Sequence, residues 1–120
     1  MKVIKMSQVE KKPRLAPLFT GPVEMQTFVG PEESKLFMIS QVNFPLGVRN
    51  KFHSHTIEQV LIVTEGKGIV ATEAEEVVVT PGDVIFIPAG EKHWHGAAPD
   101  SAFSHLYVMS PKSETTQLEP

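Results

Sequence analysis

Cysteine is absent from the 120 residues of this chain, and its absence excludes several kinds of site at once. Without a thiol there is no disulfide framework, no thiolate zinc site, no iron–sulfur cluster and no cysteine nucleophile. The absence also agrees with a reducing compartment, and we expect the protein to be cytoplasmic.

Long hydrophobic runs and an excess of basic charge are missing as well. The longest apolar stretches, such as residues 60–63 and 77–79, are short beside the roughly 20 apolar residues that a membrane-spanning helix needs. The 11 basic and 14 acidic residues are mixed along the chain and give a net charge of -3. No basic surface for nucleic acid is therefore predicted. We expect neither a membrane nor a nucleic-acid partner.

The remaining composition is that of an ordinary globular domain. Hydrophobic residues make up 41% of the chain and charged residues 21%, which excludes wholesale disorder. We expect one domain over residues 20–110. Residues 1–19 are predicted to form an N-terminal arm that can exchange a strand with a neighbouring molecule. The polar residues 111–120 are predicted to form a flexible tail.

Helical periodicity is lacking, and the chain reads as β almost throughout. Valine outnumbers leucine, and 10 prolines and 8 glycines punctuate the sequence; β-branched residues favour pleated surfaces. The expected strands are residues 23–29, 35–44, 50–55, 58–64, 69–72, 76–79, 84–87, 93–95 and 102–109. Many short strands at close, even spacing indicate an all-β sandwich or barrel.

Histidine carries the clearest functional signal. All five histidines lie between positions 53 and 105, at 53, 55, 93, 95 and 105. Side chains of a strand alternate between its two faces. His53 and His55 therefore share one face of their strand, and His93 and His95 share one face of theirs. Gln59 follows His55 by four residues and joins its face if the register continues.

Three imidazoles and one amide oxygen would form a set of ligands for a divalent first-row metal. Imidazole suits zinc, iron and nickel, whereas oxygen ligands suit manganese, so the mixed set leaves the metal open. Because Gln59 is neutral, the charge of the ion would stay uncompensated. Such an ion would be a strong Lewis acid, suited to anionic or oxyanionic substrates. If the strand register slips by one residue, Glu58 would replace Gln59 as the ligand.

Two glycine- and histidine-containing motifs extend this pattern. They are Gly47-x5-His53-x-His55-x3-Gln59-x6-Gly66 and Gly82-x5-Pro88-x-Gly90-x2-His93. They resemble the two motifs of the cupin superfamily. That resemblance implies a small jelly-roll-like barrel, the double-stranded β-helix. It also implies that His53, His55, Gln59 and His93 bind one divalent metal inside the barrel. Ala97 departs from the family pattern, which often has asparagine there.

A closer resemblance covers roughly residues 19–109. It is carried by FTGPV at 19–23, QVLIVTEG at 59–66, PAGEKHWHGAAP at 88–99 and SHL at 104–106. These runs are similar to the cupin subgroup associated with carboxymuconolactone decarboxylase, which includes bacterial hydroxynitrile lyases. The resemblance implies a metal such as manganese, which we prefer slightly over iron, zinc or nickel. It also implies a homodimer.

In this subgroup the residue matching His105 faces the metal cavity, where it could transfer a proton as a general acid or base. His95 is a second catalytic candidate or a support for the metal ligands. We expect an enzyme acting on a small molecule, with lyase- or isomerase-like chemistry that includes hydroxynitrile cleavage, in a cavity lined by phenylalanine and methionine. A metal-dependent dioxygenase and a non-enzymatic ligand-binding module are the alternatives.

Overall fold

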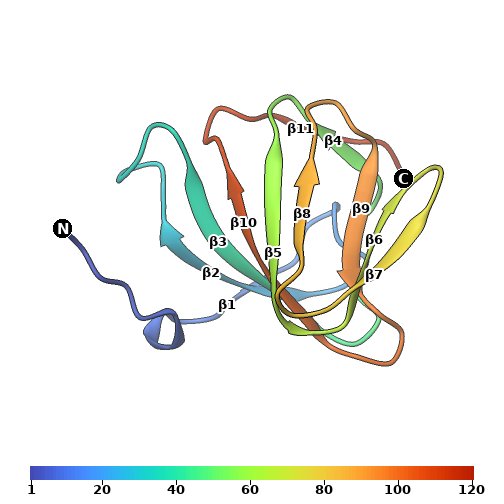
Figure 1. Cartoon of the computed structure of the whole chain (residues 1–120), viewed down its shortest axis with the longest axis horizontal. Helices are drawn as coiled ribbons and strands as arrows, with labels where there is room; N and C mark the ends of the chain where they lie inside the picture. Colours follow the sequence, from blue (N-terminus) through green and yellow to red (C-terminus); the bar gives the residue numbers. More distant parts are fainter.

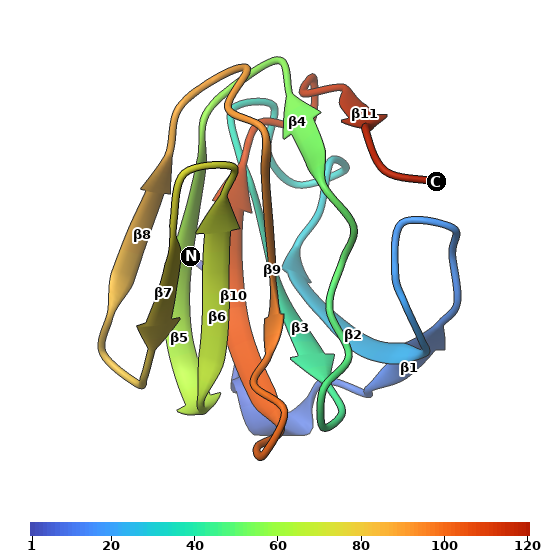
Figure 2. The same cartoon turned by 90° about the vertical axis from the view of Figure 1, so that its right-hand side faces the viewer.

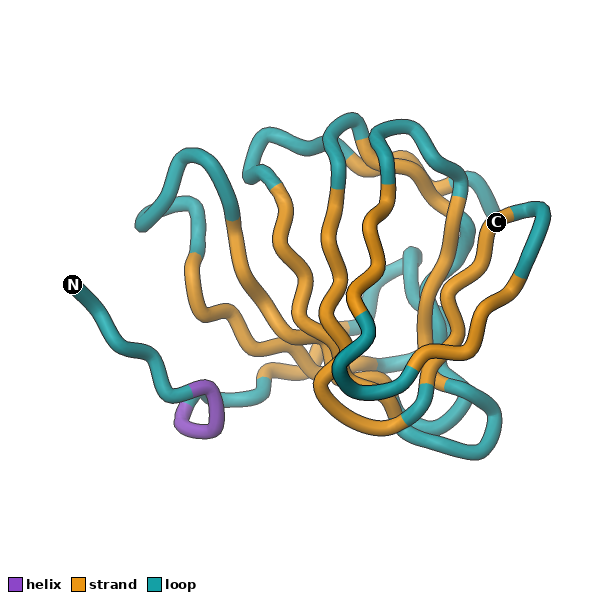
Figure 3. The backbone as a smooth tube through the Cα atoms, viewed as in Figure 1, coloured by secondary structure: helices purple, strands orange, loops and turns teal.

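The computed structural model describes residues 1–120 and consists almost entirely of β-strands and turns (Figure 3). Its one helix is a short 3-10 turn, η1 (Met6–Gln8), and no helix is long or apolar enough to cross a lipid bilayer. The strands are β1 (Lys12–Arg14), β2 (Val23–Val29), β3 (Met38–Phe44), β4 (His53–His55), β5 (Gln59–Gly66), β6 (Gly68–Thr72), β7 (Glu76–Val79), β8 (Val84–Ile87), β9 (His93–Ala97), β10 (Phe103–Met109) and β11 (Thr115–Gln117). The all-β prediction is confirmed.

The strands form two antiparallel sheets that face each other (Figures 1 and 2). The first sheet has the order β1-β2-β3-β10-β5-β8, and the second has the order β11-β4-β9-β6-β7. Neighbours within each sheet are mostly distant in sequence, as in a jelly roll. The edge strands are β1 and β8 in the first sheet and β11 and β7 in the second, and β7 and β8 lie on the same side of the molecule (Figure 2).

Two strands begin three residues later than the sequence analysis expects. The strand expected from residue 35 starts at Met38, because the Ser34 hydroxyl accepts hydrogen bonds from the backbone N–H groups of Leu36 and Phe37 and holds the preceding turn. The strand expected from residue 50 starts at His53. Its first residue, Asn50, instead forms an isolated bridge with Phe19 and donates its N–H to the carbonyl of His95.

The interior between the sheets is divided into an apolar part and a polar part. One contiguous cluster is formed by Val23, Val42, Phe44, Val63, Val79, Ala97 and Phe103. Along β9 the inward positions run from His93 through His95 to Ala97, so this strand leads from the polar part to the apolar part. The alternation that predicts a shared face for His93 and His95 is confirmed, because both are buried while Trp94 between them is half-buried.

A glycine at the end of β5 lets the chain lie close to Ala102 and pass from the first sheet to the second. Gly66 has a φ of 73°, and a Cβ at this position would collide with the backbone carbonyl of Ala102. Only glycine adopts this conformation at low cost. The chain can therefore turn at once into β6, which starts at Gly68 against the ring of Phe103.

Both terminal segments pair with strands of the domain. In the segment expected to be an N-terminal arm, β1 pairs with β2 of the same chain, with Lys12 opposite Met25. The segment expected to be a flexible tail contains β11, which pairs with β4 through Thr115 opposite His55. Near the end, Glu119 forms a two-pronged ion pair with Arg49. These backbone and ionic contacts order a segment whose polar composition gives no sign of them.

Candidate metal centre

Three histidines converge between the two sheets. One ring nitrogen from each of His53, His55 and His93 lies within 4.8 Å of the others, and all three side chains are buried. His53 and His55 share the inner face of β4, and His53 is the direct cross-strand partner of His93 on β9. The ring centroids of His53 and His93 are 4.3 Å apart. Strand alternation and one pairing register therefore place three imidazoles around one point.

Each of these rings is held by a hydrogen bond through Nδ1. His53 Nδ1 donates to the carbonyl of Lys51 at 2.6 Å, and His93 Nδ1 donates to the carbonyl of Glu91 at 2.8 Å. His55 Nδ1 lies 2.9 Å from the Thr115 hydroxyl. A neutral imidazole has one N–H, so donation from Nδ1 leaves the Nε2 lone pair free. Metal-binding histidines are commonly oriented in this way.

Four buried side-chain atoms have no hydrogen-bond partner; one is Ser113 Oγ, and the other three belong to the predicted metal ligands. They are Nε2 of His55, Nε2 of His93 and Oε1 of Gln59. The Gln59 amide nitrogen points to Met109 Sδ at 3.5 Å, which leaves its oxygen free. Leaving each such atom unpaired costs about 1–3 kcal/mol. A divalent cation would satisfy all three, so these residues fit the ion that the sequence predicts.

The alternative ligand, Glu58, is not brought to this cluster. Glu58 precedes β5 and is exposed, whereas Gln59 is the first residue of β5 and is 4% exposed. Gln59 lies opposite Ile87 of β8 on the inner face of the first sheet. The slipped register that would favour Glu58 is therefore not the register of the structure.

Burial keeps all five imidazoles neutral. Burial lowers the pKa of His53 to about 3 and that of His55 to about 4, with the neighbouring His93 lowering both further. Burial also lowers the pKa of His93 and, more strongly, that of His95. It lowers the pKa of His105 to about 4. Neutral imidazoles are the form that binds metal, so the site is ready for an ion at neutral pH.

His95 and His105 form a directed chain of hydrogen bonds behind the cluster. The Asn50 Oδ1 accepts the backbone N–H of His95 at 2.8 Å, which turns its amide N–H toward the His95 ring, 3.2 Å from Nε2. His95 Nδ1 then donates to His105 Nε2 at 3.0 Å, and His105 Nδ1 donates to the carbonyl of Leu106 at 3.1 Å. A side-chain amide N–H at one end and a carbonyl at the other set the tautomer of both rings.

His95, rather than His105, is the ring next to the cluster. The His95 ring centroid lies 5.7 Å from those of both His53 and His93. His105 is fully buried and packs against Phe44, Phe103 and His95. The sequence analysis missed Asn50, which orients the His95 ring, and Thr115, which orients the His55 ring. Asn50 occupies one of the unspecified positions of the first motif, and Thr115 lies in the segment expected to be a flexible tail.

The model of the family described as the cupin domain matches residues 40–109, which include every candidate ligand. The chain belongs to the cupin family. Among solved structures, this cupin is similar over 99% of its length to a cupin-like protein of Thermotoga maritima, with a TM-score of 0.82, 29% identity and 90% of that protein covered. The predicted double-stranded β-helix is thereby confirmed.

Curated relatives of this cupin include enzymes with different reactions. It is 40% identical over 92 residues to an (R)-mandelonitrile lyase of Granulicella tundricola, covering 76% of this chain and 70% of that protein. It is 38% identical over 66 residues to an acireductone dioxygenase of Parasynechococcus marenigrum, covering 49% of this chain and 36% of that protein. Lyase and dioxygenase chemistry thus both occur among its relatives.

Removing the hydroxyl that holds His55 should weaken metal binding. We expect Thr115→Val to lower the affinity for Mn²⁺ or Zn²⁺ by about 10- to 100-fold, because the ring loses the contact that orients it. Isothermal titration of the metal-free protein measures this affinity. Thr116→Val is the matched control, because Thr116 is the next residue of β11 and pairs with Ser54 instead. Equal affinities for the two variants would contradict this role.

Acid should destabilise the metal-free protein. The folded-state pKa values of His53, His55 and His105 lie at about 3–4, below the value of about 6.5 in an unfolded chain. Between these values the unfolded state binds more protons, so stability is lost as pH falls from about 6.5 toward 4. We expect Tm to fall by several degrees over this window, measured by circular dichroism. An unchanged Tm between pH 7 and pH 4.5 would contradict the neutral, buried state.

Proposed function

We propose that this cupin is a metal-dependent lyase that cleaves or forms a hydroxynitrile, the adduct of cyanide and a carbonyl compound. The observation that carries this proposal is the convergence of His53, His55 and His93 inside the barrel, together with the buried, unpaired acceptor atoms of His55, His93 and Gln59. The name of the 40% identical relative, (R)-mandelonitrile lyase, gives the reaction class.

His53, His55, Gln59 and His93 would hold the ion. When bound, a divalent metal supplies positive charge that polarises a carbonyl or hydroxyl oxygen. All four ligands are neutral, so this chain does not offset the charge of the ion with a carboxylate. The ligand set of this site therefore favours a substrate whose oxygen becomes more negative during the reaction.

The His95–His105 pair would move the proton. Cleavage of a hydroxynitrile removes the hydroxyl proton, breaks the carbon–carbon bond, and leaves the electron pair on cyanide, which departs as hydrogen cyanide after taking up that proton. His95 lies beside the cluster and its Nδ1 donates to His105 Nε2. A proton taken up at His95 Nε2, in place of the N–H that Asn50 donates there, would release the Nδ1 proton of His95 to His105 Nε2, which is an acceptor because His105 Nδ1 is anchored on the carbonyl of Leu106.

A dioxygenase that uses iron in the same site is the second candidate. It is supported by the similarity to an acireductone dioxygenase, which covers about half of this chain. Imidazole is also among the ligands that suit iron. Oxygen uptake by the iron-loaded protein, absent from the manganese-loaded protein, would favour this reaction over the lyase reaction.

Three predictions remain untested: manganese as the native metal, a cytoplasmic location and a homodimer. The homodimer is supported by the outer face of the first sheet, where apolar side chains remain half-buried or exposed. These are Ile39, Val60, Ile62, Val84, Phe86, Leu106 and Val108. A second copy would cover a continuous apolar surface of this kind.

Mandelonitrile cleavage tests the proposed reaction. We expect the manganese-loaded protein to release benzaldehyde from mandelonitrile, followed by absorbance, and chelation to abolish the activity. His105→Gln should lower kcat by about 100-fold or more, because a general acid–base group contributes this much. Its metal content should equal that of the unaltered protein, since His105 is outside the ligand set.

The same measurements separate the proposal from its alternatives. A metal-loaded protein that binds mandelonitrile without cleaving it would favour the ligand-binding module. Unchanged turnover in His105→Gln, with the metal retained, would remove this residue from the reaction. Loss of metal from His105→Gln would assign it a structural role instead.

A further inference from the structure

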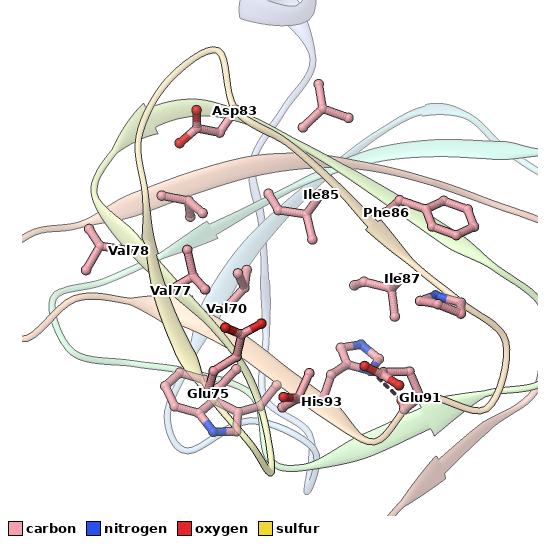
Figure 4. A pocket seen from close by; sticks show the side chains of 16 residues that line it. Val70, Glu75, Val77, Val78, Asp83, Ile85, Phe86, Ile87, Glu91 and His93 are labelled. Atoms are coloured by element: carbon pink, nitrogen blue, oxygen red, sulfur yellow. Dashed lines mark hydrogen bonds between the residues drawn. The ribbon is translucent and has the colours of Figure 1, made fainter.

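A cleft of about 560 Å³ lies between β7 and β8, which are each an edge strand of one sheet (Figure 4). Because β7 pairs only with β6 and β8 only with β5, no backbone hydrogen bonds close the gap between them. One end is formed by the β7–β8 turn, where Asp83 accepts the backbone N–H of Thr80. His93 lines the other end, so the cleft leads to a candidate metal ligand.

The walls of the cleft are apolar. Ile85 and Ile87 come from β8, Val77 and Val79 from β7, and Val70 from β6. Branched aliphatic side chains make up most of the lining; no methionine is among them, and the one phenylalanine, Phe86, is largely exposed on the outer face of the first sheet. Such walls bind the hydrocarbon part of a small molecule through burial of apolar surface, but they do not fix its orientation.

All charged side chains that line the cleft are acidic. They are Glu75, Asp83 and Glu91, and no lysine or arginine is among the lining residues. Glu91 and Glu75 lie toward the same end as His93, and Asp83 lies at the opposite end (Figure 4). An anion in the cleft would meet carboxylates near both ends and be repelled by them.

We propose that this cleft is a binding site for the hydrocarbon part of a small, uncharged molecule, such as an aryl or branched aliphatic alcohol, aldehyde or ketone, and that its carboxylates exclude anionic analogues. The sequence analysis expects the metal to favour anionic substrates, but the acidic lining opposes the entry of any anion. Placing the oxygen of the bound molecule at the His93 end rests on the proposed function. Binding of the uncharged hydrocarbon group does not.

Trp94 provides a direct readout, because it is the one tryptophan of the chain and it lines the cleft. The probes are benzyl alcohol and benzoate, which have similar size and differ in charge. We expect benzyl alcohol to change the Trp94 fluorescence saturably in the full-length protein, with and without metal. Benzoate should bind at least 10-fold more weakly to the metal-free protein. Equal affinities or no saturable change would overturn the proposal.

Two sets of variants locate the site and its charge. Val77→Phe fills the cleft and should abolish benzyl alcohol binding; retained binding would overturn the location. Glu75→Gln combined with Glu91→Gln should raise benzoate affinity several-fold and leave benzyl alcohol unchanged. The control is Glu58→Gln combined with Glu76→Gln, which makes the same charge change at exposed residues outside the cleft. An equal gain of benzoate affinity in the control would overturn the role of the lining carboxylates.

This design keeps the two proposals distinguishable. If benzyl alcohol binds with the predicted selectivity but mandelonitrile is not cleaved, the cleft stands and the lyase reaction fails. If mandelonitrile is cleaved but neither Val77→Phe nor the Glu75 and Glu91 substitutions alter ligand binding, the reaction stands and the cleft fails.

Discussion

The structure depends on imidazole rings that are buried, neutral and anchored through Nδ1. His53 and His93 use backbone carbonyls for this anchor, and His55 uses the Thr115 hydroxyl. The anchors turn the other nitrogen of each ring toward the barrel interior. There the Nε2 atoms of His55 and His93 find no protein partner. A folded protein keeps unpaired buried acceptors rarely and at a cost, and a cation is the partner that this geometry fits.

The same interior supports stability and function in separate regions. The apolar cluster around Phe44 and Phe103 closes one part of the barrel, and the histidines occupy the other. His105 lies at the boundary, because its ring packs on both phenylalanines while its Nε2 accepts from His95. A charged His105 would be costly in this position, so the apolar cluster helps to hold the imidazole chain in its neutral form.

Much of the fold and of the candidate site could be predicted because alternation along a strand is a local property. The pairs His53/His55 and His93/His95 face inward as the period of two requires, and the turns at Gly66 and Gly82 lie where the glycines indicate them. Thr115 and Asn50 could not be predicted, since each acts on a histidine 60 or 45 residues away. Because residues 111–120 are polar, the sequence predicts a flexible tail there, whereas in the structure β11 of this segment pairs with β4.

The sequence by itself determined that the chain is all-β, that its histidines fall in pairs on shared faces, and that the two motifs are those of a cupin. These features follow from local spacing and residue type. Only the tertiary structure decided that Gln59 rather than Glu58 faces the cluster, that His95 lies between the cluster and His105, and that acidic residues line the cleft beside His93. Each of these depends on the pairing register and on how the two sheets meet, which bring together side chains far apart in the chain.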